Sequence, residues 1–77
     1  MQIDKVNFLA NYILEIILIN GKKIYFDLKP FLHTARFKHI ISEEFFMKGQ
    51  LINQCCIYWD AVTEIQDYEI FGEAFIN

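Results

Sequence analysis

Residues 13–32 read ILEIILINGKKIYFDLKPFL. Two apolar runs, rich in β-branched and aromatic residues, flank the dipeptide Asn20-Gly21. Such runs favour strands, and Asn-Gly is typical of a tight hairpin turn because both residues tolerate positive φ. Pro30 ends the second run, since proline cannot donate to a strand ladder and fits the first turn of a helix. The sequence therefore predicts a β-hairpin followed by a helical turn.

A two-residue loop at Asn20-Gly21 would pair Ile17 with Ile24 across the hairpin. This register puts five apolar side chains on one face: Ile13, Ile17, Ile19, Ile24 and Phe26. A hairpin with one face in water alternates apolar and polar residues, but this hairpin is apolar on both faces. We therefore expect a cover on each face. One cover is the protein's own helix, and the other is a second subunit or a partner protein.

Shorter patterns before and after the hairpin complete the fold. Residues 4–9 predict a first strand, which turns at Asn11, and residues 31–47 predict short helical turns. Ser42, followed by Glu43 and Glu44, is typical of a helix start with a capping hydroxyl and acidic residues in the first turn. Residues 49–59 predict a second hairpin that turns near residues 53–54.

The tail, residues 63–75, predicts a C-terminal helix. Its apolar residues are spaced three or four apart, which is the helical period: Ile65, Tyr68, Phe71 and Phe75. Together the segments predict one small α+β domain over residues 1–77. We expect a small antiparallel sheet of two hairpins, short intervening helices and this C-terminal helix.

Composition and charge narrow the function classes. The 77 residues are 55% hydrophobic and 17% aromatic, which excludes a disordered tail. The net charge is −3, whereas nucleic-acid-binding domains usually have a basic surface. Residues 1–58 hold seven basic and five acidic residues, a net of +2, and residues 59–77 hold five acidic residues, a net of −5. The acidic end is interpreted as a solvated face.

The sequence does not predict export or insertion into a membrane. The N-terminal residues MQIDKVNF do not read as a signal peptide, and no apolar stretch approaches the ~20 residues of a membrane span. Cys55 and Cys56 are adjacent, so they do not form a disulfide framework. These features favour a cytoplasmic protein that does not contact a membrane.

Several motifs together resemble a known family. They are the Asn-Gly hairpin, FDLKPFL at 26–32, the phenylalanine pair at 45–46, Trp59 at a strand end and EIQDYEIF at 64–71. In this combination the chain resembles the small bacterial domain-of-unknown-function 2442 family over residues 4–73. It departs from the family pattern at residues 60–62 and 53–54. The resemblance implies a small α+β domain with no established activity and no agreed catalytic residue, some members of which are fused to a helix-turn-helix domain.

The residues that could carry catalysis or bind a metal each have a simpler interpretation. Cys55 and Cys56 would point to opposite faces of a strand, which disfavours a shared metal ion. The acidic residues near the tail suit a helix N-terminus, and they lack a calcium-loop pattern. Ser42 has no nucleophile-elbow motif around it. The sequence therefore predicts no catalytic residue, metal or cofactor, and no small-molecule substrate is identified.

Two further features keep alternatives open. Arg36, Lys38 and His39 form a candidate anion-binding cluster, although a solvated helix face is the favoured interpretation. Trp59 and Tyr58 could form an exposed recognition spot, but a strand-ending tryptophan is more often in the core.

Three hypotheses for the function follow. The first is a non-enzymatic protein-interaction module that self-associates, or binds a partner protein, through the apolar hairpin face. The second is a nucleic-acid-linked regulator, antitoxin-like or repressor-associated, and its sequence support is the cluster Arg36, Lys38 and His39 together with Lys22 and Lys23. A small enzyme is the third and least favoured.

Overall fold

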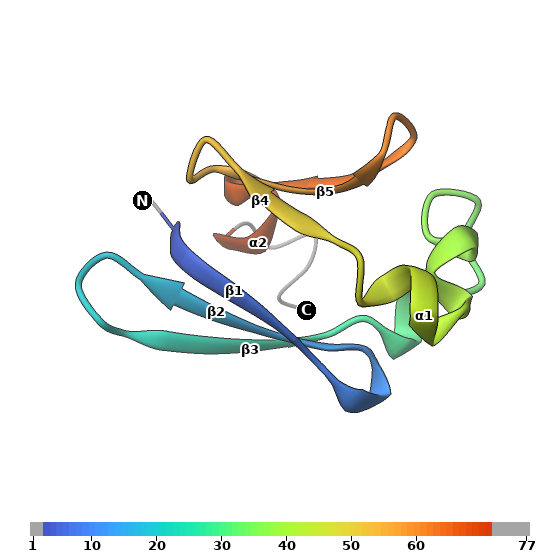
Figure 1. Cartoon of the computed structure of the whole chain (residues 1–77), viewed down its shortest axis with the longest axis horizontal. Coiled ribbons are helices and arrows are strands. Elements are labelled where there is room, and N and C mark those ends of the chain that lie inside the picture. The colour runs from blue at the N-terminus through green and yellow to red at the C-terminus, as the bar shows by residue number, and fades with distance from the viewer. Residues whose placement is uncertain (1–2, 72–77) are drawn as a thin grey trace.

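The computed structural model describes residues 3–71, which form two three-stranded antiparallel sheets (Figure 1). The first sheet has the order β1-β2-β3 and the second β4-β5-β6. The strands are β1 (Ile3–Leu9), β2 (Ile13–Leu18), β3 (Lys23–Asp27), β4 (Gln50–Ile52), β5 (Cys56–Asp60) and β6 (Thr63–Gln66). The helices are α1 (Glu43–Phe46) and α2 (Asp67–Phe71), with 3-10 turns at Ala10–Tyr12, Lys29–Phe31 and Lys38–Ile41. The predicted α+β class is confirmed, with two sheets in place of one.

The hairpin between β2 and β3 closes through a three-residue loop, not the predicted two-residue loop. Leu18 N–H donates to Lys22 C=O at 2.8 Å, so these two residues face each other across the loop. Gly21 is the last loop residue, and its φ of +89° is a conformation that residues with a Cβ rarely adopt. Its N–H donates to Leu18 C=O, which closes the turn. The predicted register is therefore wrong by one residue.

This shift changes which side chains share a face. Ile24 lies opposite Ile16, and Phe26 lies opposite Leu14, so both belong to the inner, buried face of the sheet. Ile17 lies opposite Lys23 on the other face. The prediction that Ile24 and Phe26 share a face with Ile13, Ile17 and Ile19 is therefore wrong, because a slip of one residue moves a side chain to the other side of a sheet.

The core lies between the two sheets, which are stacked in Figure 1. Ile57 on β5 and Ile65 on β6 are fully buried against the inner face of the first sheet. Trp59 is 8% exposed, and its indole N–H donates to Phe46 C=O at 2.8 Å. Trp59 is thus a core residue, and Tyr58, on the opposite face of β5, is half-buried. The core alternative for Trp59 is confirmed.

Local signals predicted two other turns and the start of α1 correctly. Asn11 lies in the turn before β2, and Asn53 and Gln54 form the turn before β5; all three have positive φ. The Ser42 hydroxyl accepts a hydrogen bond from Phe45 N–H at 3.4 Å, where α1 begins. These are short-range effects, which is why sequence reasoning finds them.

The prediction of a helix over residues 63–75 is wrong in its first part. Thr63–Gln66 form β6, because they pair with β5 along its length, with Ile65 opposite Ile57. The C-terminal helix is present but begins at Asp67, and Phe75 lies outside the described residues. None of the helices within residues 3–71 has the length and apolar character needed to cross a bilayer.

Glycine variants test the packing of the two sheets. A Cβ added at Gly49 would lie 2.5 Å from the Phe8 ring and 2.7 Å from Trp59 Nε1. We expect Gly49→Ala to destabilise the fold by about 1–3 kcal/mol through overpacking and to shift the emission of Trp59, the single tryptophan. Urea unfolding followed by fluorescence measures both effects.

Gly21→Ala is the matched control, because nothing lies within 4 Å of an added Cβ there. Its cost, about 1–2 kcal/mol, comes from the positive φ alone and should leave the native Trp59 emission unchanged. If the two variants had the same effect on that emission, the contact at Gly49 would not be tight.

Candidate functional site

The outer face of the first sheet is the candidate site. We define it by the outward-pointing residues of the three strands and the loop: Lys5, Asn7, Leu9, Ile13, Glu15, Ile17, Ile19, Lys23, Tyr25 and Asp27. The strand register arranges most of them in three rows across the sheet. The first row is Leu9, Ile13 and Asp27, the second is Asn7, Glu15 and Tyr25, and the third is Lys5, Ile17 and Lys23.

The middle row is a hydrogen-bonded chain across all three strands. Glu15 accepts from Asn7 Nδ2 at 2.8 Å with one carboxylate oxygen and from the Tyr25 hydroxyl at 2.7 Å with the other. These two bonds lower the pKa of Glu15, and the bond to Glu15 raises the pKa of Tyr25. The carboxylate is therefore charged and occupied at neutral pH, and the tyrosine ring is held in place on the face.

Apolar side chains lie on either side of this row. Ile13 and Ile17, from the central strand, are half-buried by their neighbours. Leu9, Ile19 and Tyr25 are 36%, 58% and 59% exposed, respectively. The face thus combines aromatic and aliphatic side chains with lysines at one end.

Some of the residues predicted to share one apolar face lie on the outer face of the sheet, and others do not. Ile13 and Ile17 lie on the outer face as predicted, and Ile19 is exposed in the adjoining loop, whereas Ile24 and Phe26 lie on the core face. Sequence reasoning missed Leu9 and Tyr25, which join this face from the neighbouring strands. Side chains alternate between the two faces along residues 4–9 and 23–27. With the correct register, this alternation puts Leu9 and Tyr25 on the outer face.

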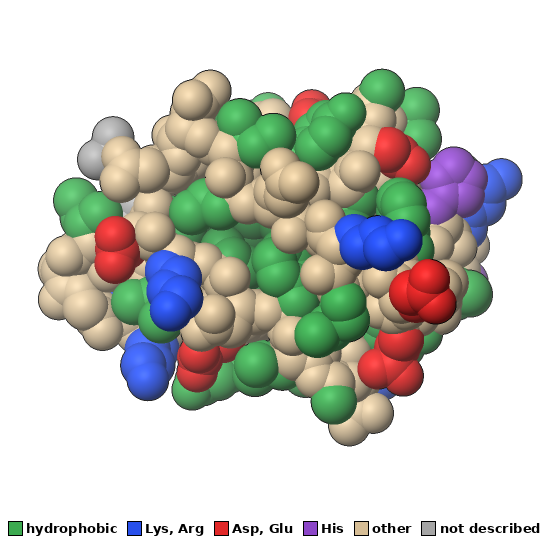
Figure 2. Space-filling model, viewed as in Figure 1, with side chains coloured by type: hydrophobic (Ala, Val, Ile, Leu, Met, Phe, Trp, Pro, Cys, Tyr) green, Lys and Arg blue, Asp and Glu red, His purple; other side chains and the backbone are tan. Residues whose placement is uncertain are grey.

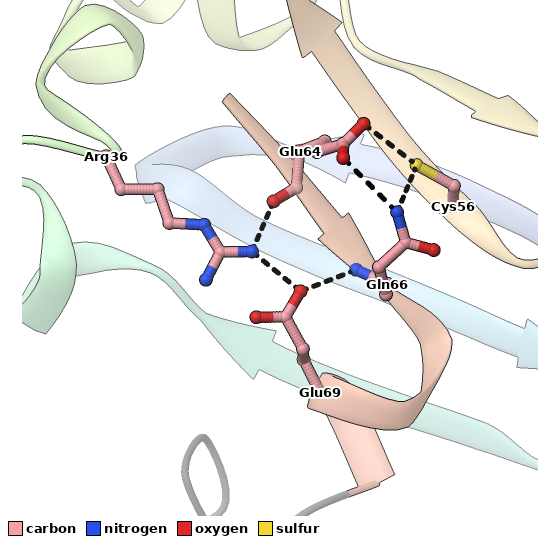
Figure 3. Close-up of polar contacts among 5 residues, drawn as sticks. All are labelled: Arg36, Cys56, Glu64, Gln66 and Glu69. Carbon is pink, nitrogen blue, oxygen red and sulfur yellow. Dashed lines mark hydrogen bonds and ion pairs between the residues drawn. The ribbon is translucent and has the colours of Figure 1, made fainter. Parts of the chain in front are cut away.

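A second polar cluster links the loop before α1 to the second sheet (Figure 3). Arg36 Nη2 donates to Glu69 Oε2 at 2.6 Å and to the backbone oxygen of Glu64 at 2.5 Å. Glu69 Oε2 also accepts from Gln66 N–H at 2.8 Å. Glu69 is therefore the carboxylate partner of Arg36, and the bond with Arg36 lowers the pKa of Glu69.

Cys56 lies at the edge of this cluster (Figure 3). Its Sγ is 3.7 Å from Glu64 Oε2 and 3.5 Å from Gln66 Nε2. Burial and the nearby Glu64 carboxylate raise the pKa of the Cys56 thiol. A thiol is reactive as the thiolate, so this environment disfavours nucleophilic or redox chemistry at Cys56.

The predicted anion-binding residues do not converge on one point. Arg36 is bound to Glu69, and His39 Nδ1 lies 3.3 Å from Asp60 Oδ2, while Lys38 is exposed. The lysines of the β2–β3 hairpin lie at the opposite end of the molecule from residues 36–39 (Figure 1). Figure 2 shows charges of both signs intermixed on the face in view, without a single basic patch.

No metal centre is formed by the residues that the structure describes. Within the range 3–71, no three side chains of His, Cys, Asp or Glu are grouped so that they could hold a metal ion. The acidic residues of the tail that sequence analysis considered are partly used within the chain, as Glu69 shows.

The Arg36–Glu69 ion pair gives a pH-dependent prediction. Because the pKa of Glu69 is lowered on folding, its contribution is fully present above the ordinary value of 4.5 and is lost as pH falls through the folded value. We expect Glu69→Gln to lower the free energy of unfolding by about 1–2 kcal/mol at pH 7, after allowing for solvent screening at the partly exposed Arg36.

Urea unfolding at pH 7 and at a series of pH values below 4.5 measures this effect. The gap between wild type and Glu69→Gln should narrow toward zero at low pH. Glu44→Gln is the control, since the Glu44 side chain is 85% exposed and should change stability by less than about 0.5 kcal/mol. A gap for Glu69→Gln that is constant with pH would contradict the charge assignment.

None of the family models, curated proteins or solved structures with which the chain was compared matches it. These comparisons neither support nor contradict the resemblance to the domain-of-unknown-function 2442 family, which stays a prediction.

Proposed function

We propose that this protein is a non-enzymatic protein-interaction module that binds a second protein chain, either another copy or a partner, through the outer face of its first sheet. One observation carries the proposal. The face exposes aromatic and aliphatic side chains, while its central carboxylate, Glu15, already has its hydrogen bonds from Asn7 and Tyr25. A partner would therefore cover apolar area without leaving that charge unpaired.

Burial of apolar surface supplies the driving force, at about 25 cal/mol per Å² before the costs of association. Tyr25 suits the role of an anchor, because tyrosine is enriched among residues that dominate interface energies. Its hydroxyl bond to Glu15 fixes the ring before binding, which reduces the entropy lost on association. Ile13 and Ile17 extend the contact along β2.

The alternatives lack a comparable observation. A nucleic-acid-linked regulator would need a basic surface, but Arg36 and His39 lie against carboxylates of the same chain. An enzyme would need a reactive group, and the raised pKa of Cys56 disfavours that thiol. The proposal includes a cytoplasmic location, which suits the free state of Cys55 and Cys56.

Ile17→Glu tests the outer face. Ile17 lies between Lys5 and Lys23, so a glutamate there gains two opposite charges and the monomer should remain folded. We expect the variant to lose association by roughly tenfold or more, the effect of removing one buried isoleucine from an interface. Sedimentation measures self-association. Affinity capture from native cytosol, with and without nuclease, measures partner binding.

Ile16→Glu is the matched control on the same strand, since Ile16 is fully buried on the inner face. It should unfold the protein, which would separate the two faces of β2 experimentally. A folded Ile17→Glu variant that keeps every association of the wild type would refute the proposed interface. A bound protein that is released by nuclease would instead favour the nucleic-acid-linked regulator.

A further inference from the structure

The outer edge of β3 is unpaired within residues 3–71, because the first sheet has the order β1-β2-β3. Strand β3 forms the lower left border of the molecule in Figure 1. Its other edge is bonded to β2, as the two ends of the ladder show. Leu18 N–H donates to Lys22 C=O at 2.8 Å, and Leu28 N–H donates to Tyr12 C=O at 3.0 Å.

These two end bonds determine where the remaining backbone groups of β3 point. In an antiparallel pair, hydrogen-bonded and non-hydrogen-bonded positions alternate along each strand. Positions 22 and 28 bond to β2, so the even-numbered residues between them do the same. Lys23, Tyr25 and Asp27 therefore direct their N–H and C=O groups away from the sheet, along the open edge. Such a row is a template for another strand.

The charges along the open edge of β3 are complementary to those of a second β3 that runs antiparallel to it. When β3 meets an antiparallel second β3 with Tyr25 opposite Tyr25, Lys23 of each copy lies opposite Asp27 of the other. All three residues then occupy hydrogen-bonded positions. Centring the pair on Lys23 or on Asp27 instead would place like charges opposite each other, which is destabilising. The register centred on Tyr25 is the one that places each Lys23 opposite an Asp27.

We propose that the interaction partner at this edge is a second copy of the chain, joined by antiparallel pairing of β3 with β3 about a twofold axis at Tyr25. This inference goes beyond the proposed function, because the dimer uses the backbone edge of β3 and not the outer face of the sheet. The product is a continuous six-stranded sheet. The twofold axis is perpendicular to that sheet, so the outer faces of both copies lie on the same side and form one surface.

The local surroundings leave both charged residues accessible to a second copy. Lys23 is exposed, and the Asp27 side chain is 45% exposed. Asp27 Oδ1 accepts from Lys29 N–H at 2.9 Å and lies 3.1 Å from Lys29 Nζ. Those contacts use one carboxylate oxygen of Asp27, and its other oxygen can face Lys23 of the second copy.

Charge reversal provides the test. Lys23→Glu puts two acidic residues opposite each other in its homodimer, and Asp27→Lys puts two lysines opposite each other. The dissociation constant of each variant's homodimer should be about tenfold or more above that of the wild type. In a mixture of the two variants every pair is complementary again, so a mixed dimer should form with an affinity within about threefold of the wild type. Sedimentation equilibrium of each protein and of the mixture measures this.

Two controls separate this effect from local damage. Lys29→Ala removes the contact between Lys29 Nζ and Asp27, keeps the backbone N–H bond to Asp27, and should leave dimerisation unchanged. If Asp27→Lys does not fold, Asp27→Asn takes its place in the test. It keeps an oxygen that can accept from Lys29 N–H, and the loss of the charge opposite Lys23 should weaken the dimer. A wild-type chain that stays monomeric up to about 1 mM, or a mixture that fails to form the mixed dimer, would overturn the proposal.

The outcomes also separate this proposal from the proposed function. If Ile17→Glu abolishes association while charge reversal has no effect, the outer face binds and the β3 edge dimer is refuted. If charge reversal behaves as expected while Ile17→Glu keeps every partner, the edge dimer stands and the outer face is refuted as an interface.

Discussion

The register of the β2–β3 hairpin is the constraint on which the rest of the structure depends. A loop of three residues, ended by Gly21 with a φ of +89°, places Leu18 opposite Lys22. This register puts Ile24 and Phe26 on the core face of the sheet, and it puts Lys23 and Tyr25 on the outer face. Because side chains alternate along a strand, a loop shorter by one residue would exchange partners along the whole of β3. The buried face and the candidate binding face are both consequences of one turn.

The second sheet and the helical segments form the other wall of the core. Trp59 on β5 donates to Phe46 C=O at the end of α1, and its ring stacks on the Phe46 ring with centroids 6.1 Å apart. Arg36 joins the loop before α1 to Glu69 on α2. These contacts connect segments that are distant in sequence, so the short helices are held by tertiary contacts and not by their own helical propensity, which is weak at such lengths.

Local chemistry made much of this fold predictable, and the errors have physical causes. The cap at Ser42 and the turns at Asn11 and Asn53 depend on neighbouring residues, so the sequence reveals them. Asn20-Gly21 is compatible with loops of either two or three residues, and the dipeptide alone does not choose between them. Residues 63–66 have helical spacing but pair with β5, because a strand partner outweighs a weak periodic pattern. The smaller part of the candidate site was predictable. Ile13 and Ile17 follow from alternation along β2, whereas Tyr25 joins them only through the register.

Tyr25 connects the two proposed surfaces physically. Its side chain lies on the outer face, bonded to Glu15, and its backbone groups lie on the open edge of β3. A strand added at that edge would therefore extend the sheet without disturbing the row formed by Asn7, Glu15 and Tyr25, since that row uses side-chain atoms alone. Edge pairing and face binding thus draw on different atoms of one residue. For this reason the two associations are compatible in one molecule, and a dimer would present a face about twice as large for a partner to cover.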